Sequence, residues 1–338
     1  MKHFFIISSH LTFSLMRKIL EVKDIDADDC VLFFVRDYRA PEKYEAVFKS
    51  RIHTSYNVDV NRGRVFAGWK FWKTRRNILC FDQIVDEKLK GEDFICYTPV
   101  CSNDICSLIV TKTNCKGYYV IEDGLASYRY YNPQSFTGIR YIIYRLLLKP
   151  LYPRIFSLKN HFIESEHPKF MGCLASSDQC FPLHRDRLAV VGMPFEPIPF
   201  DFPVDAVISV DPLYQFISLD DADRVYGKLA EYMAKKHYVY PAFKMHPRFD
   251  ASNNSQNRQA YLAIIRKYFP GIRMLDTSVI LENALAACKA DFYSFNSSVA
   301  LYASQAGCRC YNLLPLLRGT AAYEEHPILK QCTIPIEI

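Results

Sequence analysis

The chain has 338 residues, half of them hydrophobic, and its formal net charge at pH 7 is +6. The length is sufficient for two domains of ordinary size, and the composition excludes a disordered chain. So small a charge gives no argument for a nucleic-acid partner, and we expect none. It is compatible with a small anionic ligand or an anionic membrane surface.

The twelve cysteines form no CxxC pair and have no histidine pair beside them at zinc-finger spacing. We interpret them as small apolar residues in a reducing compartment and expect no metal site. Residues 1–16 weakly resemble a signal peptide, but SSH interrupts the apolar run and no A-x-A site follows. We favour a first strand followed by a helix, and no transmembrane helix is evident.

Short aliphatic and aromatic runs alternate with polar, helix-compatible sequence through the first half of the chain. Such runs are typical of buried parallel strands. The expected strands are 4–8, 30–35, 77–81, 93–97 and 118–121, and the expected helices are 11–22 and 103–110. This alternation predicts an α/β sheet with helices on both faces.

The composition changes at residues 192–205, which read GMPFEPIPFDFPVD. A segment with this many prolines cannot continue a helix or a central strand. We interpret it as a linker between a first domain, residues 1–191, and a second domain, residues 206–338.

The alternation of strands and helices restarts after the linker. The expected strands are 206–210, 237–244, 272–275 and 291–295, and the expected helices are 220–234, capped by Asp220 and Asp221, 258–268, 279–288 and one that opens at Ser297–Ser298. The predicted fold class is α/β, with two Rossmann-like domains facing a central cleft. Ligands of such domains bind beyond the carboxyl ends of the strands.

Three short polar motifs follow expected strands and therefore lie at matching positions in the predicted sheets. They are Glu122-Asp123-Gly124, Lys244-Met245-His246-Pro247-Arg248 and Asn296-Ser297-Ser298. Each motif alone is commonplace, because carboxylates, His-Pro pairs and serines also form ordinary turns and helix caps. Their combination at the carboxyl ends of strands indicates a shared ligand site.

The combination and order of these motifs resemble the bacterial sialyltransferases. Those enzymes carry a D/E-D/E-G motif, an HP motif and a late Ser-Ser or Ser-Thr motif on a two-domain GT-B fold. Here the motifs read IEDG, FKMHPR and FNSSVALY, and the resemblance is clearest over residues 206–315. Among subfamilies it is nearest to glycosyltransferase family 52, the lipooligosaccharide and capsule sialyltransferases, with the family 38 polysialyltransferases close behind.

The resemblance implies an inverting transferase that moves sialic acid from CMP-sialic acid to a hydroxyl of a galactose-type acceptor on a bacterial surface glycan. No metal or other cofactor is implied. The expected partners are the nucleotide-sugar donor and a glycan or glycolipid acceptor, and a homodimer is left open. The implied location is the bacterial cytoplasm, in solution or peripheral on the inner membrane.

The same resemblance assigns roles to the first two motifs. Asp123 is the expected base for the acceptor hydroxyl, with Glu122 raising its pKa as a neighbouring like charge and Gly124 allowing a tight turn. His246 is expected to act as an imidazolium that donates to, or protonates, the leaving phosphate. Pro247 would orient the ring.

The remaining candidates belong to the donor site. Lys244 is expected to add positive charge beside the phosphate, and Ser297 and Ser298 to bind it at a helix N-terminus. Glu282 is expected to accept hydrogen bonds from the ribose hydroxyls, the alternative being a solvated helix residue.

Several features have simpler interpretations. Two acidic clusters, 26–29 and 220–223, resemble the DxD metal motif but fall where turns or helix caps are expected. His167-Pro168 is interpreted as a loop. Residues 138–154 carry four basic residues and no acid, which indicates either a helix packed on the core or a surface that touches anionic lipid.

Two other functions remain compatible with the sequence. One is a GT-B transferase that uses another activated sugar, such as CMP-Kdo or a nucleotide hexose. The other is a non-catalytic scaffold that binds a CMP-sugar.

Overall fold

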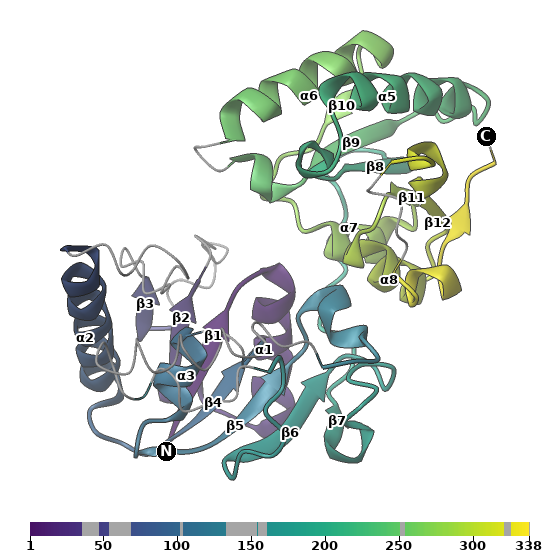
Figure 1. The fold of residues 1–338 in the computed structure, drawn as a ribbon. Helices are drawn as coiled ribbons and strands as arrows, with labels where there is room; N and C mark the ends of the chain where they lie inside the picture. Colours follow the sequence, from purple (N-terminus) through teal and green to yellow (C-terminus); the bar gives the residue numbers. More distant parts are fainter. Residues whose placement is uncertain are drawn as a thin grey trace. The chain divides into compact units, whose positions relative to one another are not determined.

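The computed structural model describes residues 1–35, 47–53, 69–101, 104–132, 154, 161–250, 254–320 and 326–337. The chain divides into two compact units, Met1–Pro194 and Phe195–Ile338 (Figure 1). The division falls inside the proline-rich segment. Phe195 packs against the Tyr302 ring with centroids 5.1 Å apart, and the Ile198 backbone N–H donates to the Asn283 carbonyl at 3.2 Å. This part of the segment therefore belongs to the second unit.

The first unit is built on a seven-stranded sheet in which every neighbouring pair is parallel. Its strands are β1 (Lys2–Ile7), β2 (Cys30–Phe34), β3 (Arg51–His53), β4 (Phe94–Thr98), β5 (Cys115–Ile121), β6 (Phe170–Ala175) and β7 (Leu188–Val190). Their order is β3-β2-β1-β4-β5-β6-β7. The sequence analysis did not predict β3, β6 and β7.

The described helices of this unit are α1 (His10–Lys23), α2 (Trp69–Leu89) and α3 (Asp104–Val110). The predicted strand 77–81 is wrong, because these residues lie inside α2. Ile78, Phe81, Val85 and Leu89 are fully buried, whereas Leu79 is 47% exposed. This spacing of three and four residues is the helical period, and it outweighs the short apolar run.

The second unit contains a six-stranded parallel sheet with the order β10-β9-β8-β11-β12-β13. Its strands are β8 (Ala206–Val210), β9 (Pro241–Met245), β10 (Arg273–Met274), β11 (Asp291–Ser294), β12 (Cys310–Asn312) and β13 (Ile334–Pro335). Its helices are α5 (Leu219–Ala234), α6 (Ser255–Tyr268), α7 (Leu281–Cys288) and α8 (Ser298–Gln305). The strand order reverses between β8 and β11, as it does between β1 and β4 in the first unit. Rossmann-like sheets bind ligands at this reversal.

Several predicted boundaries in this unit change: α6 begins at Ser255 and not at 258, and α7 begins at Leu281 and not at 279. The cap of α5 is Ser218, whose hydroxyl accepts from the Asp221 backbone N–H at 3.1 Å, and not Asp220 or Asp221. The strand predicted at 237–244 begins only at Pro241, since His237 has a positive φ of 55° that an extended strand does not adopt.

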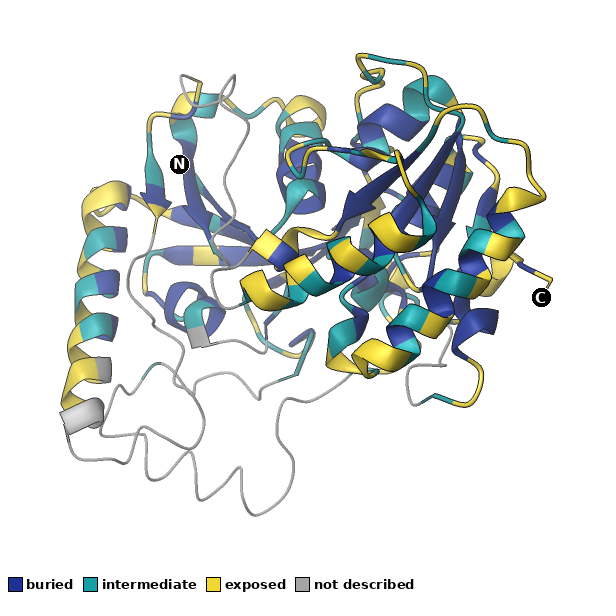
Figure 2. Cartoon of the chain, turned by 90° about the horizontal axis from the view of Figure 1, so that it is seen from above, coloured by how far each residue is buried: buried dark blue, intermediate teal, exposed yellow. Residues whose placement is uncertain are grey.

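Burial explains why the strands read as continuous apolar runs. β2 and β8 are buried at every residue, whereas α5 buries one side only. Figure 2 shows the strands as mostly buried and many helices as exposed along one side. No helix of the described residues is long and apolar enough to cross a bilayer.

Candidate functional site

Glu122 follows β5 directly and is completely buried, with 0% of its surface exposed. One carboxylate oxygen accepts from the Tyr128 hydroxyl at 2.8 Å. The other accepts from the Ser176 backbone N–H and hydroxyl, both at 2.7 Å. Ser176 follows β6, and Tyr128 ends the short 3₁₀ helix η3 (Gly124–Tyr128). Glu122 therefore connects two strand ends and supports the motif from inside the fold.

Asp123, the next residue, is only half-buried. The Ser8 hydroxyl donates to its Oδ1 at 3.3 Å, and the Asp123 backbone N–H donates to the Ser127 hydroxyl at 2.8 Å. Gly124 has a φ of 61°, in the left-handed region that glycine adopts without strain. Because Ser8 follows β1, the Asp123 carboxylate lies near the reversal of strand order. It is positioned to meet a ligand there.

His246 directly follows β9, and Pro247 begins the turn η7 (Pro247–Asp250). The Arg248 backbone N–H donates to the ring Nδ1 of His246 at 3.1 Å. Nδ1 must be unprotonated to accept this bond, so the neutral ring carries its proton on Nε2. The hydrogen bond from the Arg248 backbone therefore selects the tautomer of His246 and leaves the Nε2–H group as the donor of the neutral ring.

The surroundings of His246 favour the neutral ring over the imidazolium that the sequence analysis expects. His246 is an exposed residue. The protein atoms packed around its ring still remove part of its solvent and lower the pKa of His246, and Arg248 and Lys244 lower it further. The Asp211 carboxylate opposes this effect. Both the lowered pKa and the bond from Arg248 favour the neutral ring. An Nε2–H hydrogen bond to a phosphate oxygen remains available to this form.

Asp211 is a candidate site residue that the motifs did not reveal. It follows β8 in the stretch AVISVDPLY and is 9% exposed. Its carboxylate accepts from the Ser209 hydroxyl at 3.0 Å, the Phe295 N–H at 3.0 Å and the Asn296 N–H at 3.4 Å. Burial raises the pKa of Asp211, and these hydrogen bonds and His246 oppose the rise.

Asp211 joins the two motifs of the second unit. Phe295 and Asn296 follow β11 and lead into Ser297-Ser298, so the carboxylate fixes the start of that motif. The strand register pairs Val210 with Met245, which places Asp211 and His246 one residue beyond a paired position. A polar residue that directly ends a buried strand at the reversal was the signal that could have identified it.

Lys244 is buried in β9, with 6% of its surface exposed. Its ammonium donates to the backbone carbonyls of Thr277 at 2.7 Å and Asp276 at 3.2 Å. Burial lowers the pKa of Lys244 to about 8, although Glu282 and Asp276 oppose the shift. Lys244 therefore anchors the segment before α7. A ligand phosphate would have to compete with two carbonyls for its protons.

Glu282 lies in the first turn of α7 and is partly exposed. Loss of solvent around its carboxyl group raises the pKa of Glu282, and Lys244 opposes this effect. The charge of each of these two residues therefore shifts the pKa of the other. The next residue, Asn283, has a buried side-chain oxygen without a hydrogen-bond partner among the described residues.

Ser297 and Ser298 open α8, as predicted. Ser297 is the cap, and its hydroxyl accepts from the Val299 N–H at 3.3 Å, while Ser298 is the first helical residue. Both are partly exposed. Capping uses an acceptor lone pair of the Ser297 hydroxyl and leaves its proton able to donate to an anion.

The remaining candidates contribute no further site. Asp26 caps a short turn, and Asp29 forms an ion pair with Lys2 at 2.9 Å. Residues 138–153 lie outside the described residues, while Arg154 is paired with Asp82 of α2. Among the side chains that the structure describes, no group of three or more His, Cys, Asp or Glu could hold a metal ion.

These features define two Rossmann-like parallel α/β domains, the architecture of the GT-B class. No protein-family model matches the sequence, and no curated protein matches it. Solved structures do match. The UDP-GlcNAc 2-epimerase of Methanocaldococcus jannaschii, in complex with UDP-GlcNAc and UDP, shares 12% identity over 99% of this chain and 89% of its own, with a TM-score of 0.51.

A co-structure of S. aureus MnaA with UDP gives a TM-score of 0.52 at 9% identity, over 95% of this chain and 81% of that chain. At these identities the likeness concerns the fold alone.

Proposed function

We propose that this chain is a GT-B glycosyltransferase that uses a nucleotide-activated sugar, with CMP-sialic acid as donor and a galactose-type hydroxyl as acceptor. The observation that carries the proposal is the placement of the three motifs at strand ends of two Rossmann-like sheets. In the second sheet one buried carboxylate, Asp211, joins the His-Pro and Ser-Ser motifs at the reversal of strand order.

The proposed chemistry is direct displacement at the anomeric carbon. The acceptor oxygen forms a bond to that carbon, and the bond from the carbon to the CMP phosphate oxygen breaks, leaving its electron pair on the phosphate. Asp123 takes the hydroxyl proton. The Ser8 hydroxyl orients the Asp123 carboxylate, and the partial exposure of Asp123 suits contact with a substrate.

The second unit would bind the donor and stabilise the leaving phosphate. We assign the Nε2–H of neutral His246 to a phosphate oxygen, which gains negative charge in the transition state. Ser297 and Ser298 would donate to the same group at the start of α8. Glu282 would accept from the ribose hydroxyls. No step requires a metal ion or another cofactor.

The alternative is another activated sugar or a scaffold without turnover. The names of the similar structures include UDP and UDP-GlcNAc, so a UDP-sugar is the first alternative donor to test. Release of CMP from CMP-sialic acid, compared with release of nucleotide from CMP-Kdo and UDP-GlcNAc, separates these functions. Donor binding without release of any nucleotide would indicate the scaffold.

Two substitutions test the roles. Asp123→Asn should lower transfer by about 10²–10⁴-fold while donor binding persists. His246→Gln places an amide N–H near the Nε2 position and should keep more activity than His246→Asn, whose amide mimics Nδ1. Equal rates for these two His246 variants would contradict donation from Nε2–H, and loss of donor binding in Asp123→Asn would make Asp123 a structural residue.

A further inference from the structure

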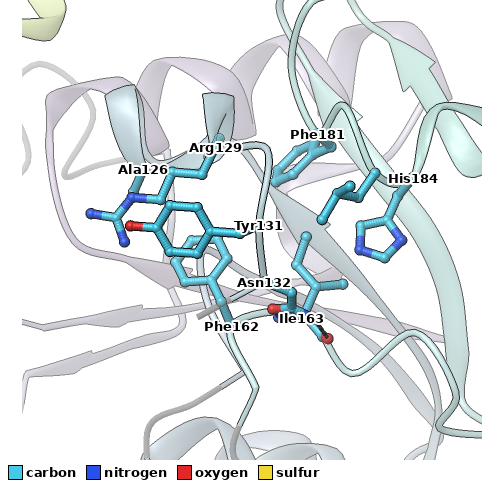
Figure 3. Close-up of a pocket in the computed structure, with 10 residues that line it drawn as sticks. Ala126, Arg129, Tyr131, Asn132, Phe162, Ile163, Phe181 and His184 are labelled. Carbon is cyan, nitrogen blue, oxygen red and sulfur yellow. Dashed lines mark hydrogen bonds between the residues drawn. The ribbon is translucent and has the colours of Figure 1, made fainter. Parts of the chain in front are cut away.

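Two arginines lie in the turns beyond strand ends, and their surroundings differ. In the first unit Arg129 directly follows η3, and its guanidinium lies 5.7 Å from the centre of the Tyr131 ring, beside a small pocket (Figure 3). That pocket has room for about one water molecule, so no larger ligand fits there. In the second unit Arg248 follows His246 and Pro247 beyond the end of β9, and it is an exposed residue. Arg248 therefore stands at the candidate donor site.

The guanidinium of Arg248 is oriented by an amide and not by an acid. Its Nη1 donates to Oε1 of Gln215 at 2.9 Å, and Gln215 ends the short turn η6 (Leu213–Gln215) that follows β8. The acid of the same turn as Arg248, Asp250, is instead paired with Arg258 at 3.4 Å. Among the residues that the structure describes, Arg248 has no carboxylate partner, whereas the arginines at positions 154, 187, 224, 258 and 309 each have one.

The backbone of Arg248 is fixed at both of its polar groups. Its N–H donates to Nδ1 of His246 at 3.1 Å, and its carbonyl accepts from the Asn254 side chain at 2.8 Å. The next residue, Phe249, is buried and packs edge-on against the Tyr214 ring of η6, with centroids 5.1 Å apart. Both turns are therefore anchored on the core, and the exposed guanidinium is pre-organised beside His246. A pre-organised group loses less conformational entropy when it binds a ligand.

This arrangement leaves Arg248 ready to bind an anion. Because Gln215 occupies Nη1, the parallel Nε–H and Nη2–H groups remain able to hold both oxygens of one carboxylate. The other cation of the motif, Lys244, already donates to two backbone carbonyls. Arginine also keeps its charge at any pH at which the chain is folded, while the ring of His246 favours the neutral form.

We propose that Arg248 binds the carboxylate on the anomeric carbon of the donor sugar, and that it thereby selects nucleotide-activated ulosonic acids over nucleotide hexoses. The inference rests on the proposed function, which assigns the leaving phosphate to His246. In such a donor the carboxylate and the leaving oxygen are attached to the same carbon, so a cation beside His246 is within reach of the carboxylate. A hexose donor has no carboxylate there and would leave the guanidinium unpaired.

The test compares ligands that differ in this carboxylate, by calorimetric titration of the full-length chain. CMP is a matched reference, because at about pH 8 its phosphate monoester carries nearly the same charge as the phosphodiester and carboxylate of CMP-sialic acid together. Arg248→Gln should weaken the binding of CMP-sialic acid and of CMP-Kdo about tenfold or more, and leave the binding of CMP unchanged.

Two further variants separate position from charge. Arg224→Gln removes the same charge from an exposed arginine of α5 and should leave all three affinities at the wild-type level. Gln215→Ala keeps the guanidinium but removes the contact that orients it. It should weaken the binding of CMP-sialic acid by less than Arg248→Gln does, again without an effect on CMP.

The outcomes distinguish this inference from the proposed function. Equal losses for CMP and CMP-sialic acid in Arg248→Gln would assign Arg248 to the phosphate and overturn the inference, and so would an unchanged affinity for CMP-sialic acid. Neither result would affect the proposed transfer. A selective loss in Arg248→Gln, with a wild-type chain that releases no CMP, would support the inference and refute the transfer. A wild-type chain that binds UDP-GlcNAc but not CMP-sialic acid would overturn both.

Discussion

Removal of the Asp211 carboxylate is the sharpest test of how the second unit is organised. Asp211→Ala would leave three donors without their acceptor: the Ser209 hydroxyl and the backbone N–H groups of Phe295 and Asn296. The start of α8 would lose the side chain that connects it to β8. Asp211→Asn keeps the shape, removes the charge and replaces one acceptor oxygen by an amide N–H donor. With the amide oxygen toward the Phe295 and Asn296 N–H groups, that donor faces the Ser209 hydroxyl, which can accept.

The expected loss of stability follows from these contacts. Phe295 is buried, and an unsatisfied buried N–H costs about 1–3 kcal/mol, while each of the other two bonds contributes about 0.5–1.5 kcal/mol. Burial of the charge offsets part of this sum, as the raised pKa of Asp211 shows. We therefore expect Asp211→Ala to lower the free energy of unfolding by about 2–3 kcal/mol, and Asp211→Asn by less than about 1 kcal/mol.

The pH dependence has a definite sign. Because the pKa of Asp211 is raised in the folded state, the folded chain binds more protons than the unfolded chain above the ordinary value of 3.8. The stability that Asp211 contributes is complete below that value and is lost as pH rises through the folded-state pKa. The wild-type chain should therefore lose stability relative to Asp211→Asn as pH increases from about 4.

Urea denaturation at several pH values measures these differences. NMR titration of the His246 ring provides a second readout, because loss of the Asp211 charge should lower the pKa of His246 further. An unchanged His246 titration in Asp211→Asn would refute the electrostatic link. A change below 0.5 kcal/mol in Asp211→Ala would refute the structural role, since that is the scale of ordinary surface substitutions, about ±0.5 kcal/mol.

Three further predictions concern stability, each measured by denaturation against the wild-type chain. Glu122→Ala should lower it by about 3 kcal/mol, because three donors lose a buried acceptor; a neutral result would exclude this support of the motif. Phe81→Ala should cost about 3–5 kcal/mol and Leu79→Ala less than about 0.5, and equal costs would contradict the helical face of α2. Because the pKa of Lys244 is lowered to about 8 in the folded chain, folded Lys244 binds fewer protons than unfolded Lys244 between about pH 8 and 10.5. Its contribution to stability should rise between about pH 8 and 10.5, and this rise should be absent in Lys244→Met.

Local pattern determined much of the fold. The apolar runs at β1, β2, β4, β8 and β11 were recognisable because strands buried on both faces read as continuous apolar sequence. The predicted two-domain α/β class is confirmed, and the three motifs do lie at strand ends. Short or partly exposed strands such as β3 and β7 carry too little apolar sequence to be recognised.

Only the tertiary structure decided which side chains are available at those strand ends. Adjacent carboxylates look alike in sequence, yet Glu122 is buried with three hydrogen-bond donors around it, while Asp123 stays partly exposed. The apolar run at 77–81 became part of a helix because the buried positions from Ile78 to Leu89 are spaced by three and four residues, which is the helical period. The role of Asp211 depends on residues 84 and 85 positions later in the chain, and no local pattern carries a contact of that range.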